Sequence, residues 1–294
     1  MTAHAQNYIN VLNGRFYYLP SVQLKNNSTD ISFKEYRIEG AIPVQLRGGS
    51  TLGIKPQYKT FTLSGNSNSL RDLTLYSFKL PLFGYLKFKD SKWSAYIELS
   101  PKLNSDLKNI DIRHFQIGST VLAYYEKKKD FYWQLGIYYN EDTYGPFIIP
   151  MLGVDWKIDE KNYLAVLLPA YMIYERKLND KFYTGFEMEL TGETYRLGNT
   201  AYKDSYISQF GENKLTFLTE PRLFLDYYVA PHLVLYIKPG MRLFQKYEQF
   251  DDTNDKLLKN PEYIQGQLKS SFYTEFGIAY RFRYDEESKD TQDN

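Results

Sequence analysis

The stretch at residues 270–282, SSFYTEFGIAYRF, decides the fold because its side chains change character at every second position. One parity is mostly large and apolar: Phe272, Thr274, Phe276, Ile278, Tyr280 and Phe282. The other parity is mixed: Ser271, Tyr273, Glu275, Gly277, Ala279 and Arg281. A period of two residues predicts a β-strand with one face in an apolar medium.

The composition allows two readings of this apolar face. Tyrosine (29) and phenylalanine (19) are abundant among the 294 residues, yet the mean hydropathy is −0.51. No run of roughly 18 apolar residues predicts a transmembrane helix. The chain is therefore expected either to be soluble or to cross a membrane as alternating strands, whose two faces cancel in an average.

The charges and the missing cysteines narrow the function classes. Lysine plus arginine (36) nearly balance aspartate plus glutamate (35), so the basic field that nucleic-acid binding needs is not expected. Cysteine is absent, which excludes disulfides and thiol catalysis.

The two ends of the chain are predicted to lie outside the folded domain. MTAHAQ at residues 1–6 contains a small-x-small pattern, so residues 1–5 are interpreted as the remnant of a signal peptide; a chance Ala-His-Ala is the alternative. Residues 285–294 have no apolar side chain and predict a disordered polar tail. The domain between them spans residues 6–284.

Short polar connections and longer ones mostly alternate along the chain, as in an outer-membrane barrel with tight periplasmic turns and long outer loops. This pattern predicts an all-β, closed antiparallel transmembrane barrel of about 14 strands with both termini in the periplasm. One run must be split at Pro169 to keep the count even; about 12 strands is the fallback. The predicted strands lie near residues 15–24, 32–47, 51–63, 72–88, 93–103, 111–127, 131–140, 146–158, two between 162 and 178, 182–195, 214–228, 232–247 and 268–283.

The predicted outward face is apolar along every strand, for example at Tyr36, Ile38, Trp93, Leu135 and Ile278. Aromatic residues recur near the short turns, where an interfacial girdle belongs: Phe88, Trp93, Tyr125, Phe131, Trp156, Tyr163 and Phe182. The strands of a soluble β-sandwich would also alternate between apolar and polar side chains, but a sandwich has no need of such an aromatic girdle.

The opposite parity predicts a polar lumen whose charges have both signs. The lumen-facing charged candidates are Arg37, Glu39, Lys55, Lys79, Glu98, Lys102, Asp155, Glu187, Glu189, Glu220, Arg222, Asp226, Lys238, Arg242, Glu275 and Arg281. Opposite charges across a lumen can pair, and paired charges brace a barrel rather than select an ion, so the structural reading is preferred.

Prolines are expected to face each other across four turns, in the pairs Pro43 and Pro56, Pro81 and Pro101, Pro150 and Pro169, and Pro221 and Pro239. Because proline cannot donate to a ladder, such pairs predict a level at which strands bend; a ligand-admitting notch is the second reading.

Residues 33–58 (FKEYRIEGAIPVQLRGGSTLGIKPQY) and the segments LSPKLNSDLKN, FIIPMLGVDWKIDEKNYLAVLLP and LTGETYRLG within residues 99–198 resemble an uncharacterised family of Bacteroidota outer-membrane barrels, described as domain of unknown function 6268. The resemblance covers most of the chain. It implies an outer-membrane barrel and implies no activity.

Catalytic, metal and cofactor sites are not expected. The chain has three histidines, of which His4 falls within the predicted signal remnant and is expected to be removed with it, His232 abuts a short turn and His114 stands alone near a long loop. Asp251, Asp252 and Asp255 lie in an acidic loop without the glycine and terminal glutamate of a calcium loop.

Three functions remain, in order of preference: a passive or gated outer-membrane channel for small solutes, a barrel with a filled lumen that serves as a structural or assembly subunit, and a lipid hydrolase. The expected partners are outer-membrane lipid, the outer-membrane assembly machinery and other outer-membrane proteins. No nucleic acid is expected.

Overall fold

The computed structural model shows a closed antiparallel β-barrel of 14 strands, which confirms the predicted fold and strand number. The structure describes residues 7–25, 30–65, 72–142, 145–189, 192–198, 206–211, 220–243, 245–251, 256–257 and 266–283. The predicted signal remnant (1–5) and polar tail (285–294) lie outside these ranges.

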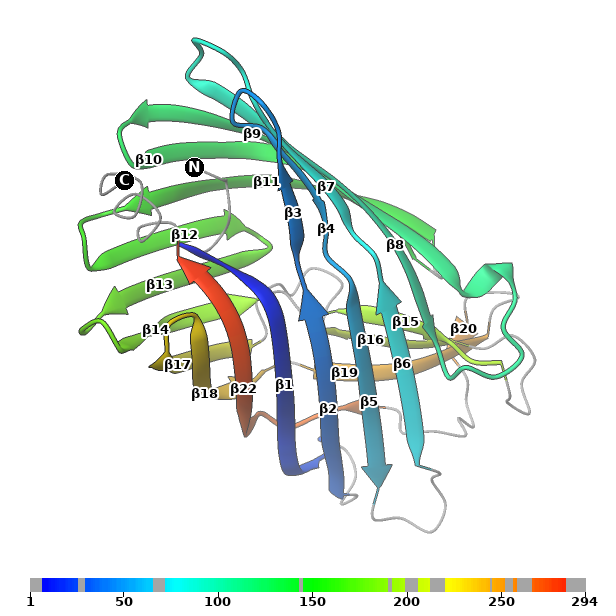
Figure 1. Ribbon diagram of the computed structural model, residues 1–294. Coiled ribbons are helices and arrows are strands. Elements are labelled where there is room, and N and C mark those ends of the chain that lie inside the picture. Colours follow the sequence, from blue (N-terminus) through cyan, green and yellow to red (C-terminus); the bar gives the residue numbers. More distant parts are fainter. Residues whose placement is uncertain are drawn as a thin grey trace.

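Most strands of the wall are continuous (Figure 1). These are β1 (Tyr8–Gln23), β8 (Trp93–Ser105), β9 (Phe115–Lys128), β10 (Phe131–Asp142), β11 (Gly145–Lys157), β12 (Asn162–Leu168), β13 (Tyr171–Lys177), β14 (Phe182–Glu189), β17 (Glu220–Ala230), β18 (Leu233–Arg242) and β22 (Ser271–Arg283). Three further wall strands each consist of two segments: β2 (Asp30–Gly40) and β3 (Ile42–Gln45), β4 (Thr51–Ile54) and β5 (Gln57–Gly65), and β6 (Leu73–Lys79) and β7 (Leu82–Lys87).

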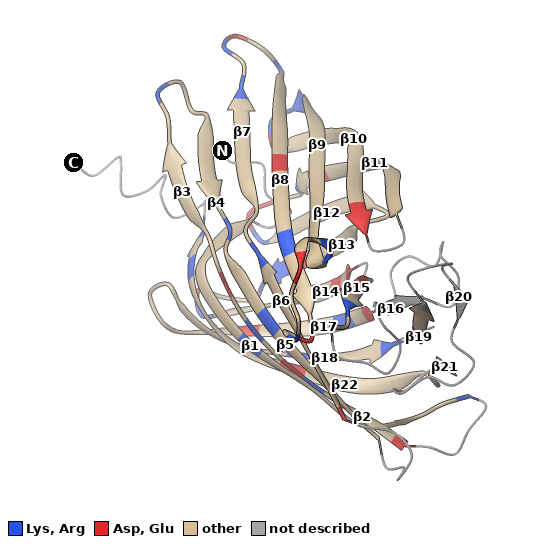
Figure 2. Ribbon diagram, turned by 90° about the vertical axis from the view of Figure 1, so that its right-hand side faces the viewer, with Lys and Arg blue, Asp and Glu red and all other residues tan. Residues whose placement is uncertain are grey.

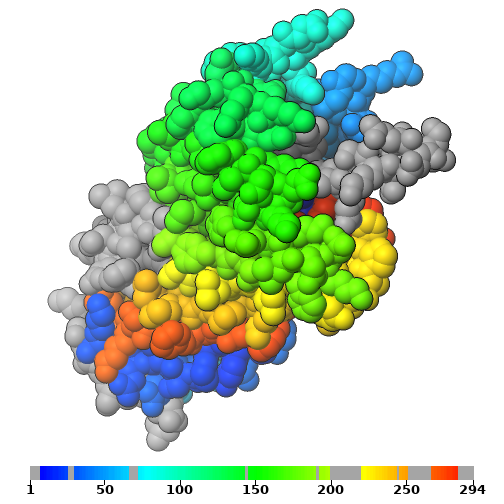
Figure 3. All heavy atoms as spheres, turned by 90° about the vertical axis from the view of Figure 1, so that its left-hand side faces the viewer, coloured from blue at the N-terminus to red at the C-terminus, as the bar shows by residue number. Residues whose placement is uncertain are grey.

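The last strand closes the ring. β22 pairs with β18 on one side and with β1 on the other, where Tyr8 lies opposite Arg283 and Phe16 opposite Phe276. Figure 3 shows the orange of the chain's end between the yellow of β17 and β18 and the blue of the first strands. Both described ends of the chain therefore lie at the rim that carries the short turns.

The alternation in β22 confirms the predicted two-sided strand. Phe272 is 75% exposed and Ile278 49%, whereas Tyr273 and Glu275 are 3% exposed and Arg281 1%. The same contrast runs around the barrel, where exposed Leu, Ile, Val and aromatic side chains form an apolar outer surface. In the described part of the chain, no helix has the length and apolar character needed to cross a membrane.

Several predicted strand ends are wrong. β1 begins at Tyr8 rather than near residue 15, because a register shift between Asn10 and Leu12 interrupts the two-residue period on which the prediction depended. β14 ends at Glu189, before the predicted 195, and β18 ends at Arg242, before the predicted 247. β9 begins at Phe115, after a 3-10 turn, η1 (Ile112–His114). Part of the predicted strand at 214–228 lies outside the described residues, and β17 begins at Glu220.

The predicted proline pairs do not face each other, because each turn is centred slightly away from its expected position. Pro43, for example, lies opposite Gly53 rather than Pro56. The predicted bend level does exist on neighbouring strands, where β2, β5 and β6 are separated from β3, β4 and β7. Each break is bridged by one hydrogen bond to a proline carbonyl: Gly40 N donates to Pro56 (3.0 Å), Lys55 N to Pro81 (2.8 Å) and Leu80 N to Pro101 (3.0 Å).

A smaller sheet lies against the inner wall near the long-connection rim. β15 (Glu193–Arg196) pairs with β16 (Tyr206–Gly211), which pairs with β19 (Gln245–Asp251); β20 (Lys256–Leu257) and β21 (Gly266–Gln267) pair with β19. Tyr247 of β19 stacks against Phe33 and Phe61 of the wall, at centroid distances of 5.4 and 6.2 Å. We call β15, β16 and β19 the inner sheet.

Candidate functional site in the barrel interior

Charged side chains from β14, β17, β18 and β22 form a buried network on one wall. Arg222 is paired with Glu187 and, at 2.6 Å, with Glu189, while Lys238 Nζ lies 2.7 Å from Glu187. The side chains of Arg222 and Glu187 are only 3% and 2% exposed. Burial of an isolated charge is costly, and here each buried charge lies beside one of opposite sign that neutralises it.

Two further pairs continue this wall toward its rims. Arg242 lies 2.5 Å from Glu220 on the side of the long connections, and Arg281 is paired with Asp226 on the side of the short turns. Because antiparallel strands bring inward positions of neighbouring strands side by side, pairs of opposite charge follow from the register of β17, β18 and β22.

The neighbouring sector, on β1 and β2, carries a more exposed group of charges. Arg37 lies 2.6 Å from Glu35, and Glu39 accepts hydrogen bonds from Asn13 (2.9 Å) and Arg15 (3.3 Å). The Glu39 side chain is 27% exposed, so this sector borders open space rather than packed protein.

Near the line of strand breaks, two lysines reach across the interior. Lys55 Nζ lies 2.8 Å from the hydroxyl of Tyr96 and 3.5 Å from Glu98, and it sits 4.6 Å from the ring centroid of Phe83. Lys79 Nζ lies 2.5 Å from Glu193 of the inner sheet. The side chain of Lys55 is 32% exposed and that of Glu98 20%.

Two of the predicted lumen residues stand outside these pairs. Lys102 forms no ion pair with any described residue, and Asp155 accepts a hydrogen bond from Tyr163. Every other predicted candidate pairs with an oppositely charged described residue: Arg37, Glu39, Lys55, Lys79, Glu98, Glu187, Glu189, Glu220, Arg222, Asp226, Lys238, Arg242, Glu275 and Arg281.

The inner wall on β7 to β12 is aromatic and aliphatic instead. A cluster of buried side chains covers it: Phe83, Tyr85, Tyr96, Leu122, Tyr124, Met151 and Leu167. Tyr132, Tyr138 and Tyr171 pack against this cluster and remain partly exposed. The interior therefore has an ion-paired side and a tyrosine-rich side, which Figure 2 shows in part as charged bands on the strands near β1, β2 and β5.

The inner sheet covers a different sector. Tyr195 and Tyr247 are each 1% exposed and pack into a cluster with inward residues of β1, β2, β5, β6 and β22. Glu193, next to Tyr195, is paired with both Lys59 and Lys79 of the wall. Two aromatic anchors and a carboxylate between two lysines thus fasten β15 and β19 to the wall.

The family model described as a domain of unknown function, DUF6268, matches residues 45–281. The chain belongs to this family. Among solved structures it is similar to the COG4313 outer membrane channel from Pseudomonas putida F1, with a TM-score of 0.46, 10% identity, and 93% of this chain and 96% of that chain covered.

Two other solved structures align with this DUF6268 chain less closely. The NanC porin gives a TM-score of 0.37 at 11% identity and covers 92% of this chain and 98% of its own. The translocator domain of the autotransporter NalP from Neisseria meningitidis gives 0.35 at 10%, covering 92% and 88%. No curated protein matches the sequence.

The DUF6268 barrel contains inward charges that the sequence reasoning missed. Arg15, Glu35 and Lys59 have the parity of their inward neighbours and could have been found by it. Glu193 was assigned to a wall strand that in fact ends at Glu189. Arg283 pairs with Glu175 at 2.7 Å, and β22 extends one residue past the quoted stretch to include Arg283.

His114 of this DUF6268 barrel has a local structural role. Its Nδ1 accepts a hydrogen bond from the backbone N–H of Asp111 (3.0 Å), and Asp111 caps η1 in return. Hydrogen bonds from Arg113, the largest cause, hold the pKa of the exposed Asp111 carboxyl below its usual range. Among the described residues, no group of three potential ligands could hold a metal ion; Asp252 and Asp255 of the acidic loop lie outside them.

Proposed function

We propose that the chain is an integral outer-membrane channel for small solutes, passive or gated, with its short turns and both termini in the periplasm. The support for membrane insertion is the outer surface, where Ile38 (56% exposed), Leu135 (63%) and Leu235 (43%) come from three different wall strands, β2, β10 and β18. In a closed barrel the strands satisfy one another's backbone hydrogen bonds, which hydrocarbon requires; among the described residues β3, at the short-turn rim, pairs on one side only, with β4.

The observation that carries the channel function is the exposure of charged and tyrosine side chains that point inward. Lys55, Lys79 and Glu98 are 20–32% exposed although they face the interior. Ionised groups keep such exposure where water reaches them. We infer a hydrated path beside these residues, bordered on one side by the tyrosine-rich wall and on the other by the inner sheet.

Planar-bilayer recording tests the channel. We expect discrete conductance steps, and the double variant Lys55→Glu/Lys102→Glu should shift the reversal potential in a salt gradient toward cation selectivity, because it replaces two cations by anions: Lys55, beside the path, and Lys102, which lies opposite Lys79 in the β6–β8 pairing. The control is Lys127→Glu/Lys129→Glu, which reverses two exposed lysines at a short turn. Unchanged selectivity in the first variant would exclude a path beside Lys55.

A second candidate is a barrel with a filled lumen that serves as a structural or assembly subunit beside other outer-membrane proteins. The buried network on β14, β17, β18 and β22 favours it, because its charges are nearly inaccessible to water. A protein that inserts correctly but gives no conductance would support this function over the channel. Insertion by the outer-membrane assembly machinery and the lack of an enzymatic activity belong to both proposals.

A further inference from the structure

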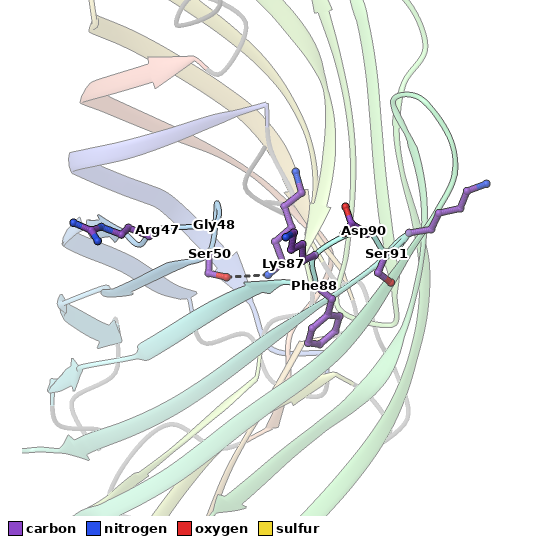
Figure 4. A pocket seen from close by; sticks show the side chains of 9 residues that line it. Arg47, Gly48, Ser50, Lys87, Phe88, Asp90 and Ser91 are labelled. Carbon is purple, nitrogen blue, oxygen red and sulfur yellow. Dashed lines mark hydrogen bonds between the residues drawn. The ribbon is translucent and has the colours of Figure 1, made fainter.

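The tips of two neighbouring hairpins enclose a cleft at the rim of the short turns. β4 and β7 pair as far as Thr51 and Tyr85, and Lys87 N donates one further hydrogen bond to Ser50 Oγ (3.1 Å). Beyond this point the β3–β4 and β7–β8 turns separate and leave a cavity of about 610 Å³ between them (Figure 4).

The cleft is basic, with four cations and one carboxylate among its lining residues. Arg47 comes from one tip and Lys87, Lys89 and Lys92 from the other, against the single carboxylate of Asp90. None of these four cations forms an ion pair with a described residue. The interior of the barrel differs, because nearly every buried cation there lies against a carboxylate, and so does Lys177 beside Asp180 at another short turn (2.7 Å).

The cleft also lies at the edge of the apolar outer surface. Phe88, one of its lining residues, is 48% exposed, and Trp93, which directly follows Lys92, is 50% exposed. On the β3–β4 hairpin the outward side chains Val44 and Leu46 are 57% and 41% exposed. Exposed Trp and Phe beside an apolar band mark the level of lipid headgroups. Figure 2 shows both tips projecting from the same end of the barrel with blue segments near them.

We propose that this cleft binds the phosphate-bearing headgroup of an anionic phospholipid in the leaflet on the short-turn side. The cations that line the cleft attract the phosphate, and the acyl chains run along the apolar faces of β3 and β8. The hydroxyls of Ser50 and Ser91 accept hydrogen bonds from Lys87 N and Trp93 N and keep their own protons to donate to phosphate oxygens. A volume of about 610 Å³ holds a headgroup with its glycerol, whereas a free phosphate would leave most of it empty.

This site rests on the membrane placement of the proposed function but not on an open lumen. Trp93 offers a local reporter, because the chain contains three tryptophans and Trp133→Phe/Trp156→Phe leaves Trp93 alone. In phosphatidylcholine vesicles, brominated phosphatidylglycerol should quench Trp93 fluorescence more than brominated phosphatidylcholine at the same mole fraction. We expect a quenching ratio of about threefold or more, given the attraction of clustered basic residues to anionic lipid.

In the same background, Arg47→Gln/Lys87→Gln/Lys89→Gln/Lys92→Gln should bring the ratio to about one. The milder Lys89→Gln/Lys92→Gln variant should lower it partly, which keeps the test valid if the fourfold variant inserts poorly. The matched control, Lys127→Gln/Lys129→Gln/Lys161→Gln/Lys181→Gln, removes as many exposed charges from other short turns and should leave the ratio unchanged.

Equal quenching by the two lipids in the starting protein would overturn the proposal. So would an equal loss of the ratio in the control variant, which would show diffuse attraction by net charge. Loss of the ratio on adding inorganic phosphate at constant ionic strength would assign the cleft to free phosphate rather than lipid. Conductance is recorded from the same proteoliposomes, so a silent channel and an empty lipid site are separate outcomes.

Discussion

At the scale of single residues, the chain treats its charges in two ways. Inside the barrel, low exposure makes a lone charge costly, and Arg222 accordingly meets Glu187, Glu189 and Glu275. At the tips of the short turns, water solvates the cations and no such pairing is needed. Arg47 and Lys89, which form no ion pair with a described residue, are therefore available to a ligand that arrives from outside the chain.

Arg222→Met tests the buried network. Removing one cation leaves three carboxylates near one another, and breaking a buried pair in this way costs about 3–5 kcal/mol. We expect the urea concentration at the midpoint of unfolding, in detergent or vesicles, to fall accordingly. The folded fraction is measured by the heat-modifiable migration of the barrel on gels.

The control for this change is Arg113→Met, which removes an arginine whose side chain is 44% exposed and whose partner is Asp111. An exposed pair contributes at most about 1 kcal/mol, so the barrel should remain close to its original stability. Similar losses in both variants would mean that the Arg222 network does not brace the wall.

At the scale of elements, wall strands were predictable because each presents one face to an apolar medium and the other to the interior, as β22 shows in its alternation of Phe276 and Glu275. The split of residues 162–178 into β12 and β13 followed from Pro169 and the even strand count. Both inferences needed only local sequence and the rule that a barrel closes.

The inner sheet could not be predicted in the same way. Glu193 and Tyr195 share one parity, as inward residues of a wall strand would. The wall residue that both contact, Lys59, lies far away in the sequence. Alternation reports that a strand has two different faces but not which surface each face meets. The bend level was partly predictable, because prolines cannot donate a backbone hydrogen bond to a neighbouring strand. The identity of the facing residues was not, because it depends on the centre of each turn, which alternation leaves uncertain by about a residue.

The attachment of the inner sheet should control the conductance. Glu193→Gln removes the charge that holds β15 to Lys59 and Lys79, and each hydrogen bond to a charged group contributes about 1.5–3 kcal/mol. We expect the open fraction in single-channel records to rise at least about tenfold, provided that it is low in the starting protein.

Glu248→Gln is the control within the same sheet, because Glu248 pairs with Lys246 of its own strand at 2.5 Å and with no wall residue among those that the structure describes. This variant should conduct as the starting protein does. An unchanged open fraction in Glu193→Gln would show that the inner sheet is a fixed lining of the barrel rather than a gate.

At the scale of the whole molecule, the membrane proposal depends on what touches the outer surface. The exposed apolar side chains come from strands on all sides of the ring, so no single protein partner of ordinary size could cover them. A bilayer surrounds the whole circumference of such a belt, and the exposed aromatic residues Trp93 and Trp133 are of the kind found at a membrane–water interface.

One leucine and one isoleucine can show whether hydrocarbon or water surrounds the barrel. Leu135, in the middle of the belt on β10, is 63% exposed, and Ile112, in the connection before β9, is 81% exposed. Near the midplane of a bilayer, arginine on the lipid face costs about 2–4 kcal/mol, whereas in water the same change is nearly neutral. Leu135→Arg should therefore lower the unfolding free energy in vesicles by that amount and reduce insertion, while Ile112→Arg should leave both unchanged. If Leu135→Arg were as harmless as Ile112→Arg, water or a polar partner would have to surround this belt, and the membrane placement would be wrong.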